Sequence, residues 1–452
     1  MKIKIKQTEC DICVIGGGPA GYSAALRASQ LGARVILAER RDLGGTCLNR
    51  GCIPTKFLWQ SLNFQKKIKR ASDFGITAPA VNLSFASVIE KKTKTVDLLV
   101  KNLRGHIEKS AIKILHVTAS LAGCGIVEYI EPGTGEKIHI KAAGIIIAAG
   151  SSPNSIPGLT VDHETIIDSD DFFLLKELPK SLLVIGGGAI GVELAAIASG
   201  FGCEVTLAEK QPHILPAEDA ELAGEVKKTL LRQGVKVLEG EQGVSSIAKS
   251  FEKVLVATGR KPNTDALTLE NAGVKYSKQG IEVNDFIETS AKGIYAAGDV
   301  NGRSYLAYTA QGEGITAAEN ALGQKNSFGI KHIPKAVFSF PPSASAGAKE
   351  QDCAASDISI GRSLVSANSK AFIEGERSGF VKVICDKQSG RLLGVQMAGP
   401  DAENLITTAA LAIKNGLSAA DLSRELFFHP ATAETLYEAC QDALGKSIER
   451  VK

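Results

Sequence analysis

The chain has 452 residues, 44% of them hydrophobic and 22% charged, and its formal net charge is +3. These values are typical of a globular protein of about three domains, and they give no electrostatic reason to expect binding to nucleic acid or an anionic membrane. No secretory signal stands in the first ten residues, and the apolar stretches near Ile145 and Ile185 are too short to cross a bilayer.

The nine cysteines are an odd number scattered without a disulfide framework, which indicates a reducing compartment and therefore a cytoplasmic protein. Cys10 and Cys13 form a C-x-x-C motif inside a predicted strand, residues 10–15. Residues three apart on a strand point to opposite faces of the sheet. We therefore expect two buried packing residues here and no disulfide.

The first clear motif is a dinucleotide fingerprint. A predicted strand at 12–15 leads into GGGPAG at 16–21, then an alanine-rich helix to about Leu31, and a second strand at 35–38 that ends on Glu39. This order is typical of a dinucleotide-binding βαβ unit: a strand, a glycine-rich turn, a helix, and a second strand that ends on an acidic residue.

Each fingerprint residue has a predicted task. Gly16 makes the turn, Gly18 lets the backbone approach a pyrophosphate, and Gly21 lets the helix pack closely on the strand. Glu39 accepts hydrogen bonds from the ribose hydroxyls.

The segment GGTCLNRGCIPTK, residues 44–56, follows. In a helix that begins near Thr46, Cys47 and Cys52 lie about one and a half turns apart, within closing distance. The helix N-terminus should lower the thiol pKa and favour the reactive thiolate. The pair suits thiol–disulfide exchange; the alternatives are two unrelated buried cysteines or half of a zinc site. Lys56 lies one turn beyond Cys52 on the same face.

The fingerprint then recurs. A predicted strand at 182–185 leads into GGGAIG at 186–191, a helix, and a strand at 205–208 that ends on Glu209. Gly186, Gly188, Gly191 and Glu209 stand 170 residues after their counterparts, so two nucleotide sites are predicted. A carboxylate at the strand end pairs with free ribose hydroxyls and repels a 2′-phosphate, so Glu209 favours NAD over NADP.

Two further runs, at 145–150 and 254–260, close on a glycine, the second on Gly259. The run at 294–300 holds Gly298 and Asp299, which taken alone would be a simple turn.

From about Ile333 the pattern changes to short strands and helices, which indicates an α+β domain. Near its end, His429 directly precedes a predicted helix that starts at Pro430 and holds Glu434 in its first two turns. A carboxylate there can orient the imidazole and raise its pKa, which leaves the other ring nitrogen free for proton transfer. A structural histidine is the alternative.

In order and over nearly the whole chain, these motifs resemble those of the two-dinucleotide flavoprotein disulfide reductases, the class I pyridine nucleotide–disulfide oxidoreductases. GGTCLNRGCIPTK is most similar to the segment found in the dihydrolipoyl dehydrogenases. The resemblance implies an α/β fold with two Rossmann-like dinucleotide-binding domains and a C-terminal α+β dimerisation domain. The expected boundaries are 1–150 with 271–332 for the FAD domain, 151–270 for the NAD domain and 333–452 for the interface domain.

The resemblance also implies roles. The first fingerprint would hold FAD and the second NAD, with Gly259 at a crossing between the two domains. Asp299 would bind the ribityl chain of FAD. Lys56 would lie near the reactive nitrogen of the flavin and pair with Glu193, against the alternative of an exposed lysine and an exposed glutamate.

The implied function is the oxidation of dihydrolipoyl groups with NAD by a homodimer that needs no metal ion. Cys47 would exchange with the substrate and Cys52 would face the flavin. His429, oriented by Glu434, would act on the cysteines of the other subunit. The expected partner is a lipoyl-bearing protein of a 2-oxoacid dehydrogenase or glycine cleavage type complex.

Three places depart from the family pattern. The stretch between Glu209 and Gly259 is short, as if a β-hairpin were missing; residues 339–342 and Tyr308 stand where these dehydrogenases carry histidine-containing sequences. Other readings are a different NAD(P)H-dependent disulfide reductase, such as a glutathione-type or mercuric reductase, or a non-catalytic FAD-binding scaffold subunit. A glutathione-type reductase would prefer NADP, which Glu209 opposes. A mercuric reductase would carry an adjacent cysteine pair near its C-terminus, whereas Cys440 stands alone there.

Overall fold

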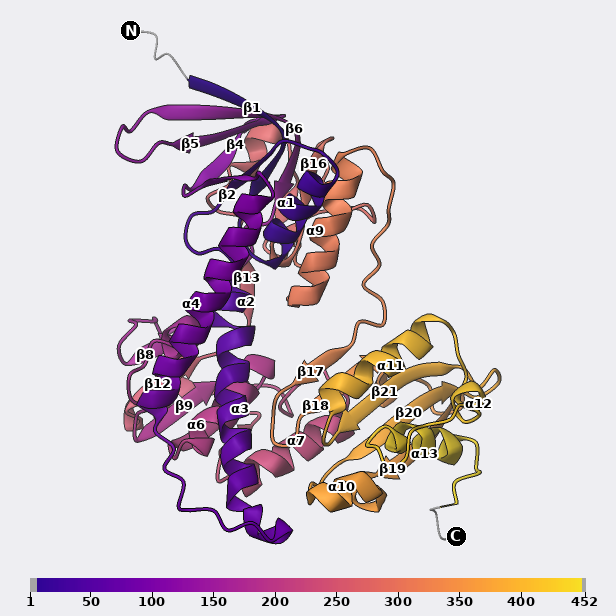
Figure 1. Ribbon diagram of the computed structural model, residues 1–452. Coiled ribbons are helices and arrows are strands. Elements are labelled where there is room, and N and C mark those ends of the chain that lie inside the picture. The colour runs from indigo at the N-terminus through magenta and orange to yellow at the C-terminus, as the bar shows by residue number, and fades with distance from the viewer. Residues whose placement is uncertain (1–5, 449–452) are drawn as a thin grey trace. The chain divides into compact units, whose positions relative to one another are not determined.

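The computed structural model describes residues 6–448, and the chain forms two compact units (Figure 1). Unit 1 is made of Met1–Ser61, Leu83–Asn154 and Gly259–Ile330. Unit 2 is made of Leu62–Asn82, Ser155–Thr258 and Lys331–Lys452. Unit 2 therefore contains most of the predicted NAD domain together with the predicted interface domain, and the three-domain boundaries stay predictions.

Unit 1 is built on a seven-stranded sheet in the order β3-β2-β1-β6-β5-β4, with β16 paired to β6. Its parallel strands are β1 (Lys6–Ile15), β2 (Val35–Ala38), β3 (Lys113–Leu115), β6 (Lys137–Ile147) and β16 (Ile294–Ala296). β4 (Ala119–Gly123) and β5 (Ile126–Ile130) extend the sheet in antiparallel fashion. The remaining elements are α1 (Pro19–Gln30), α2 (Gly45–Arg50), α4 (Phe85–Lys109), α9 (Ala307–Ala321) and the short pairs β7 (Ser151–Pro153) with β13 (Arg260–Pro262) and β14 (Tyr276–Ser277) with β15 (Gly280–Ile281).

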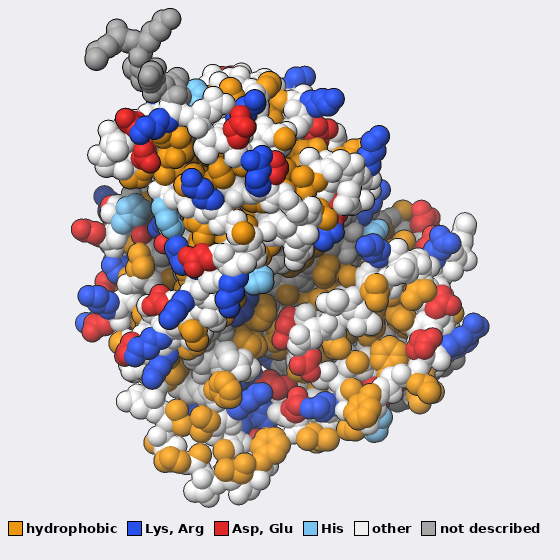
Figure 2. All heavy atoms as spheres, turned by 45° about the horizontal axis from the view of Figure 1, so that its top comes forward, with side chains coloured by type: hydrophobic (Ala, Val, Ile, Leu, Met, Phe, Trp, Pro, Cys, Tyr) orange, Lys and Arg blue, Asp and Glu red, His pale blue; other side chains and the backbone are white. Residues whose placement is uncertain are grey.

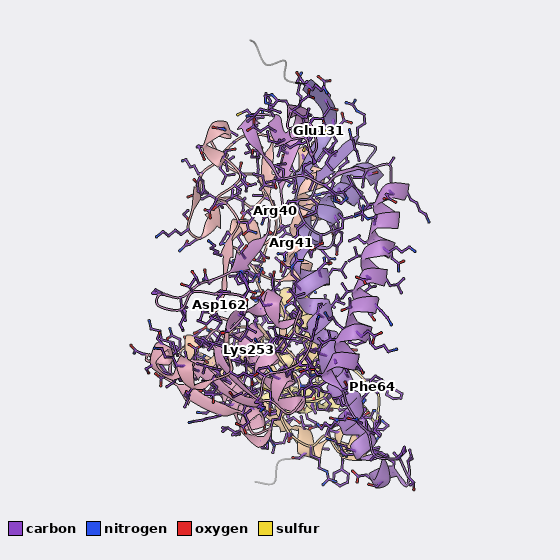
Figure 3. The ribbon with its side chains drawn as sticks, turned by 90° about the vertical axis from the view of Figure 1, so that its left-hand side faces the viewer. Arg40, Arg41, Phe64, Glu131, Asp162 and Lys253 are labelled. Atoms are coloured by element: carbon purple, nitrogen blue, oxygen red, sulfur yellow. The ribbon has the colours of Figure 1, made fainter. Side chains whose placement is uncertain are left out.

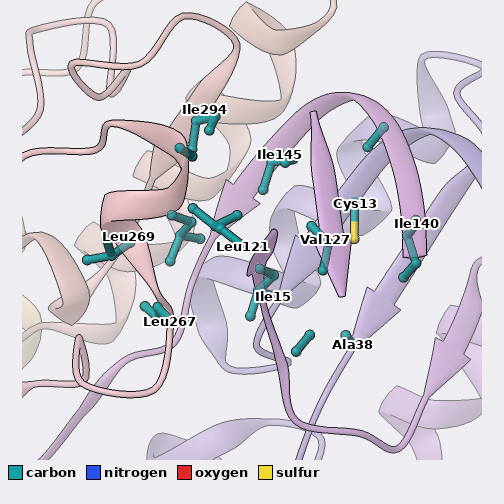
Figure 4. Close-up of a cluster of buried hydrophobic side chains, with 14 of the residues drawn as sticks. Cys13, Ile15, Ala38, Leu121, Val127, Ile140, Ile145, Leu267, Leu269 and Ile294 are labelled. Carbon is teal, nitrogen blue, oxygen red and sulfur yellow. The ribbon is translucent and has the colours of Figure 1, made fainter. Parts of the chain in front are cut away.

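Both faces of the central strands of unit 1 are buried, as is typical of parallel strands covered on two sides. Ile12 and Val14 pack with the alanines of α1 and with α9, which lies beside α1 (Figure 1). Cys13 and Ile15 point to the other face, into a cluster that contains Val127 (Figure 4).

Cys10 belongs to the same cluster as Cys13, so the prediction that the two face opposite sides is wrong. The backbone N–H groups of both Asp11 and Ile12 donate to the carbonyl of Arg34, at 3.0 and 3.2 Å. This local irregularity of β1 breaks the strict alternation of side chains, as a β-bulge does. The prediction that both cysteines are buried is confirmed.

Unit 2 contains a parallel five-stranded sheet in the order β11-β10-β9-β12-β8 and a second, antiparallel sheet in the order β17-β18-β21-β20-β19. The strands of the first are β8 (Ile166–Asp168), β9 (Ser181–Ile185), β10 (Glu204–Glu209), β11 (Lys236–Glu239) and β12 (Lys253–Val256), with helices α5 (Ser169–Phe172), α6 (Ala189–Gly200), α7 (Ala220–Arg232) and α8 (Val244–Ile247). The second has β17 (Lys335–Val337), β18 (Ser343–Gly347), β19 (Ile358–Leu364), β20 (Phe380–Asp386) and β21 (Leu392–Ala398), with α10 (Ser369–Glu374), α11 (Ala402–Lys414), α12 (Ala419–Leu422) and α13 (Glu434–Ala443).

A buried ion cluster joins the two sheets' elements within unit 2. The side chain of Lys382 on β20 is 1% exposed, and its ammonium lies 2.7 Å from the carboxylate of Asp219, the N-cap of α7. Glu221 and Glu350 lie 3.0 and 2.9 Å from the same ammonium. A buried lysine needs such partners, because an unpaired charge in the interior is costly.

Two predicted helices differ from the structure. The cysteines lie on two helices, because α2 ends at Arg50, Gly51 leaves the helical conformation, and α3 (Cys52–Lys69) begins at Cys52. The last helix begins at Glu434 and not at Pro430.

Lysine, arginine, aspartate and glutamate side chains are interspersed over the face drawn in Figure 2, in keeping with the small net charge. Among residues 6–448, the helices are too short or too polar to cross a membrane.

Candidate functional site

The first fingerprint forms a turn that only glycine can make. Gly16 has φ +105°, and a Cβ there would lie 2.2 Å from the carbonyl oxygen of Ala148 at the end of β6. A Cβ on Gly21 would lie 1.7 Å from the carbonyl oxygen of Gly16, so α1 packs directly on the turn. The backbone at Gly18 faces open space, since a Cβ there would meet only Gly45 Cα, at 3.8 Å. The predicted tasks of these glycines suit this geometry.

Glu39 closes the same turn from the end of β2. One oxygen of its buried carboxylate accepts from Gly17 N at 2.6 Å, and the other accepts from Arg41 N at 2.6 Å. Arg40 and Arg41 follow it directly, in the turn labelled in Figure 3. Since a carboxylate has about four acceptor positions, lone pairs remain for ribose hydroxyls.

The second turn repeats the first within unit 2. Gly186 also has φ +105°, and a Cβ there would lie 2.5 Å from the Ala257 carbonyl oxygen; on Gly191 it would lie 1.8 Å from the Gly186 oxygen. Glu209 accepts from Gly187 N at 2.6 Å and from Gln211 N at 2.7 Å. A Cβ on Gly188 would meet nothing within 4 Å, which leaves its backbone open to a ligand.

The two predicted redox cysteines lie on adjacent helices, Cys47 on α2 and Cys52 at the start of α3. Their segment is anchored on the first turn, since a Cβ on Gly45 would lie 2.7 Å from Gly18 Cα. Asn49 Nδ2 donates to the carbonyls of Leu43 and Gly45, both at 2.9 Å, and Thr55 Oγ1 donates to the Gly51 carbonyl at 2.6 Å. Sequence reasoning missed these supports, which depend on backbone carbonyls that no motif marks.

The pKa of Cys47 is raised and not lowered, contrary to the sequence prediction. The Cys52 side chain beside it is the main cause and burial is the second, while Lys56 opposes both. In such a thiol pair one sulfur keeps the proton while the other carries the charge. The neighbouring Cys52 sulfur therefore disfavours ionisation of the Cys47 thiol.

Tyr22 of α1 lies near both cysteines, and the sequence did not single it out. Burial raises the pKa of its phenol, and Cys47 and Cys52 raise it further. Its oxygen accepts from Gln311 Nε2 on α9 at 2.7 Å, which fixes the ring.

Asp299 is held by a chain of hydrogen bonds that the sequence did not reveal. Ser151 Oγ donates to its carboxylate at 2.5 Å, and Arg260 Nε donates to Ser151 Oγ at 2.7 Å. Burial raises the pKa of Asp299. Glu313 of α9, almost fully buried, accepts from Gly298 N at 2.8 Å and so fixes the turn that presents Asp299. Gly259, with φ +99°, lies where the chain returns to unit 1 just before Arg260.

Lys56 and Glu193 fall in different compact units. Glu193 is buried on α6, and its Oε1 accepts from Phe338 N at 2.9 Å. Their pairing stays a prediction.

His429 and Glu434 meet as predicted. Nδ1 of His429 lies 2.8 Å from Glu434 Oε1, and the other glutamate oxygen accepts from Ala431 N at 3.0 Å. Asn368 Nδ2 donates to the Ala431 carbonyl at 2.9 Å and holds the same loop. The imidazole is 70% exposed, so its Nε2 edge is open to a substrate or to a partner subunit.

The three departures are visible locally. Residues 240–252 form α8 and a short 3-10 helix with no strand. Tyr308, the second departure, is 47% exposed on α9. In the third, residues 339–342, Ser339 Oγ donates to the Pro341 carbonyl at 2.7 Å.

Two Rossmann-like turns, each closed by a buried glutamate, together with a dithiol packed on the first, define the class: a two-dinucleotide oxidoreductase with a redox-active cysteine pair. The family described as pyridine nucleotide-disulphide oxidoreductase matches residues 10–314, and its dimerisation domain matches 333–440. The chain belongs to this family. It is an NAD-dependent flavoprotein oxidoreductase whose cofactors are FAD and NAD.

Named relatives agree. The chain is 38% identical to a dihydrolipoyl dehydrogenase of Bacillus subtilis (strain 168), over 97% of this chain and 99% of the relative. It is 38% identical to a dihydrolipoyl dehydrogenase of Thermus scotoductus, over 95% and 96%. Among solved structures, it is similar to the Cu(II) complex of the HOCl-induced flavoprotein disulfide reductase RclA from Escherichia coli, with TM-score 0.86, 26% identity, and coverage of 96% and 99%.

Proposed function

We propose that this enzyme oxidises dihydrolipoyl groups carried by a partner protein and passes the electrons to NAD. The names of the relatives at 34–38% identity over nearly the full length support the substrate. The matching dimerisation domain supports a homodimer. The partner would be the lipoyl-bearing protein of a 2-oxoacid dehydrogenase or glycine cleavage type complex. The nine cysteines, scattered without a disulfide framework, support a cytoplasmic location.

The cofactor sites fit the residues present. Open space over Gly18 and over Gly188 leaves room for a pyrophosphate, and both glutamates keep free lone pairs for ribose. FAD, when bound, would accept an electron pair from the thiols and deliver it to NAD as hydride. The residues that would hold FAD are Gly16, Gly18, Gly21, Glu39, Lys56 and Asp299; those for NAD are Gly186, Gly188, Gly191 and Glu209. Glu193 would pair with Lys56, and Gly259 would lie at the chain crossing between the two cofactor domains.

The two cysteines would have separate roles in the exchange. A substrate thiolate attacks Cys47 of the Cys47–Cys52 disulfide, and Cys52 leaves as thiolate. The second substrate thiol then attacks the mixed disulfide, closes the lipoyl ring and releases Cys47. Cys47 would be the thiol that exchanges with the substrate, and Cys52 would be the thiol that faces the flavin.

The observation that carries the proposal is the His429–Glu434 pair. The Glu434 carboxylate accepts a hydrogen bond from Nδ1 of His429, which leaves Nε2 of the imidazole for proton transfer. Nε2 would take a proton from the substrate dithiol, and the resulting thiolate would be the nucleophile. In a homodimer this exposed imidazole would act on the cysteines of the other subunit.

The test is His429→Gln, which should lower dihydrolipoamide oxidation by at least about 10²-fold, the usual contribution of a general base. FAD content and reduction of the flavin by NADH should not change. His163→Gln is the matched control, since His163 is a 66% exposed histidine that also lies 2.9 Å from a carboxylate, that of Asp171. Equal losses in the two variants would contradict the proposal.

A mixed dimer sharpens the same test. A Cys47→Ser chain combined with a His429→Gln chain should regain one working site of two. Mixed dimers without activity, from parents that both retain FAD, would exclude a site shared between subunits. A panel of dihydrolipoamide, glutathione disulfide and thioredoxin, each with NAD(H) and NADP(H), separates the proposal from another reductase and from a scaffold.

A further inference from the structure

The peptide group of Ala431 is held from both of its ends. Its carbonyl accepts from Asn368 Nδ2 at 2.9 Å and from the backbone N–H of Glu434 at 3.3 Å. Its N–H donates to Glu434 Oε2 at 3.0 Å. The other oxygen of the same carboxylate, Oε1, lies 2.8 Å from His429 Nδ1. The His429–Glu434 pair is therefore connected, through one peptide group, to an asparagine 63 residues earlier in the chain.

The side chain of Asn368 is itself fixed. It is buried, and its Oδ1 accepts from Ala371 N at 3.0 Å as the N-cap of α10. Nδ2 is therefore the end that meets the Ala431 carbonyl, since an oxygen there would face another oxygen. The backbone N–H of Asn368 donates to the Val365 carbonyl at 3.0 Å, which ties the residue to the 3-10 helix before it. Asn368 thus presents a donor whose position is set by its own segment.

The loop that carries His429 has little packing of its own within the chain. Leu426 and Phe428 are 100% and 78% exposed, and residues 426–428 form neither helix nor strand. Phe427 lies between them and packs on Tyr437 of α13, with ring centroids 5.7 Å apart. Hydrogen bonds to the loop backbone therefore have a large share in fixing the position of His429.

Packing between the Asn368 segment and the start of α13 is also incomplete. Val365 and Ala371 from the first segment, with Thr432 and Thr435 from the second, line a cavity of about 10 Å³. This is about the volume that one water-sized sphere needs, so the two segments do not close completely on each other. The hydrogen bond from Asn368 to Ala431 joins the same two segments.

We infer, on the basis of the proposed function, that Asn368 is a positioning residue of the acid–base pair. Asn368 fixes the Ala431 peptide, the peptide fixes the Glu434 carboxylate, and the carboxylate orients the imidazole of His429. Without the Nδ2 donor the peptide can rotate, and the imidazole spends less time in the orientation that serves the substrate dithiol. Asn368 acts through the peptide and takes no proton itself.

Asn368→Ser separates the two contacts of this side chain. A serine hydroxyl caps a helix about as well as asparagine does, but it is too short to reach the Ala431 carbonyl. Dihydrolipoamide oxidation should fall at least about fivefold, the change in population that one hydrogen bond of ordinary strength controls. FAD content and stopped-flow reduction of the flavin by NADH should not change, since neither uses His429. Asn415→Ser is the matched control and should keep full activity, because the exposed Asn415 also donates through Nδ2 to a backbone carbonyl, that of Leu411, at 2.8 Å.

A double-mutant cycle tests whether the effect passes through Glu434. In a Glu434→Ala background there is no carboxylate to orient, so Asn368→Ser should lower dihydrolipoamide oxidation by less than about twofold. A full fivefold loss in that background would overturn the inference, and so would an equal slowing of the NADH reaction by Asn368→Ser. If the serine variant is purified without FAD, Asn368→Asp takes its place, since aspartate is an equally good cap and also lacks the donor.

His429→Gln in the same assay keeps this role apart from the proposed function. Full activity in Asn368→Ser together with a large loss in His429→Gln would refute only the role of Asn368. Full activity in His429→Gln would refute the proposed function itself, whatever the asparagine variant does.

Discussion

The two glycine-rich turns are built alike, but the sheets that carry them are extended differently. In each turn a first glycine at φ +105° packs on a carbonyl of a neighbouring strand end, and a buried glutamate accepts two backbone N–H groups. After the third strand of its unit, the chain of unit 1 adds β4 and β5 before β6, with Leu121 and Val127 fully buried. At the corresponding place in unit 2 it forms only α8 and a 3-10 helix, whose buried residue is Ala248.

This difference shows which contacts a nucleotide-binding turn requires and which part of the sheet can vary. Every contact that shapes the turn comes from the three central strands and the first helix, as the Ala148 and Ala257 carbonyls illustrate. The insertion of unit 1 extends the sheet beyond β6, where β5 pairs with residues 137–141 of β6 and not with the end of that strand that meets Gly16. An insertion at this place can therefore shorten without touching the contacts of the turn. The short NAD domain is therefore compatible with an intact second turn.

The largest effect is expected at the glycines under the first helices. Gly21→Val and Gly191→Val each place a side chain within 2 Å of a backbone oxygen, where nothing flexible can move away. Overpacking of this kind costs about 1–3 kcal/mol or more and should open the turn. Gly21→Val should be purified without FAD, whereas Gly191→Val should keep FAD and lose at least tenfold in NADH affinity.

Flavin absorbance and NADH titration measure these two outcomes. Gly105→Ala on α4 and Gly224→Ala on α7 are the controls, since a Cβ at either meets nothing within 4 Å. Loss of FAD from the Gly191 variant would show that the two turns do not act independently.

Sequence alone predicted both turns, the glutamates, the cysteine pair and the His429–Glu434 contact, because each rests on short-range spacing. It failed where tertiary contacts decide. Strand alternation could not foresee the irregularity at Asp11 that brings Cys10 beside Cys13. Helix-dipole reasoning gave the wrong sign for the pKa of Cys47, since the neighbouring Cys52 outweighs it. The Arg260–Ser151–Asp299 chain joins residues more than 100 positions apart, which no local pattern records.

The insertions themselves should differ in their contribution to stability. Leu121→Ala removes a side chain with 0% exposure and should lower the free energy of unfolding by about 2–5 kcal/mol. Ile247→Ala, on the half-buried α8, should cost about 1 kcal/mol. Urea unfolding followed by flavin fluorescence and by circular dichroism gives both values. If Ile247→Ala were the more damaging, the short insertion of unit 2 would be part of its core after all.

The smallest expected effect distinguishes the two glutamates by the nucleotide that each meets. At Glu209 the negative charge should repel a 2′-phosphate, so the enzyme should prefer NAD to NADP by at least about tenfold, or roughly 1.4 kcal/mol. Glu209→Ser removes that charge and should bring the kcat/KM values for NAD and NADP closer together. The affinity for both cofactors should fall, because Gly187 N and Gln211 N lose their acceptor. Glu39→Ser is the matched change in unit 1: it should weaken FAD binding and leave the cofactor ratio as it is. A ratio near one in the unaltered enzyme would mean that the carboxylate, occupied by its two backbone donors, does not face the ribose, and attention would move to Lys210 beside it.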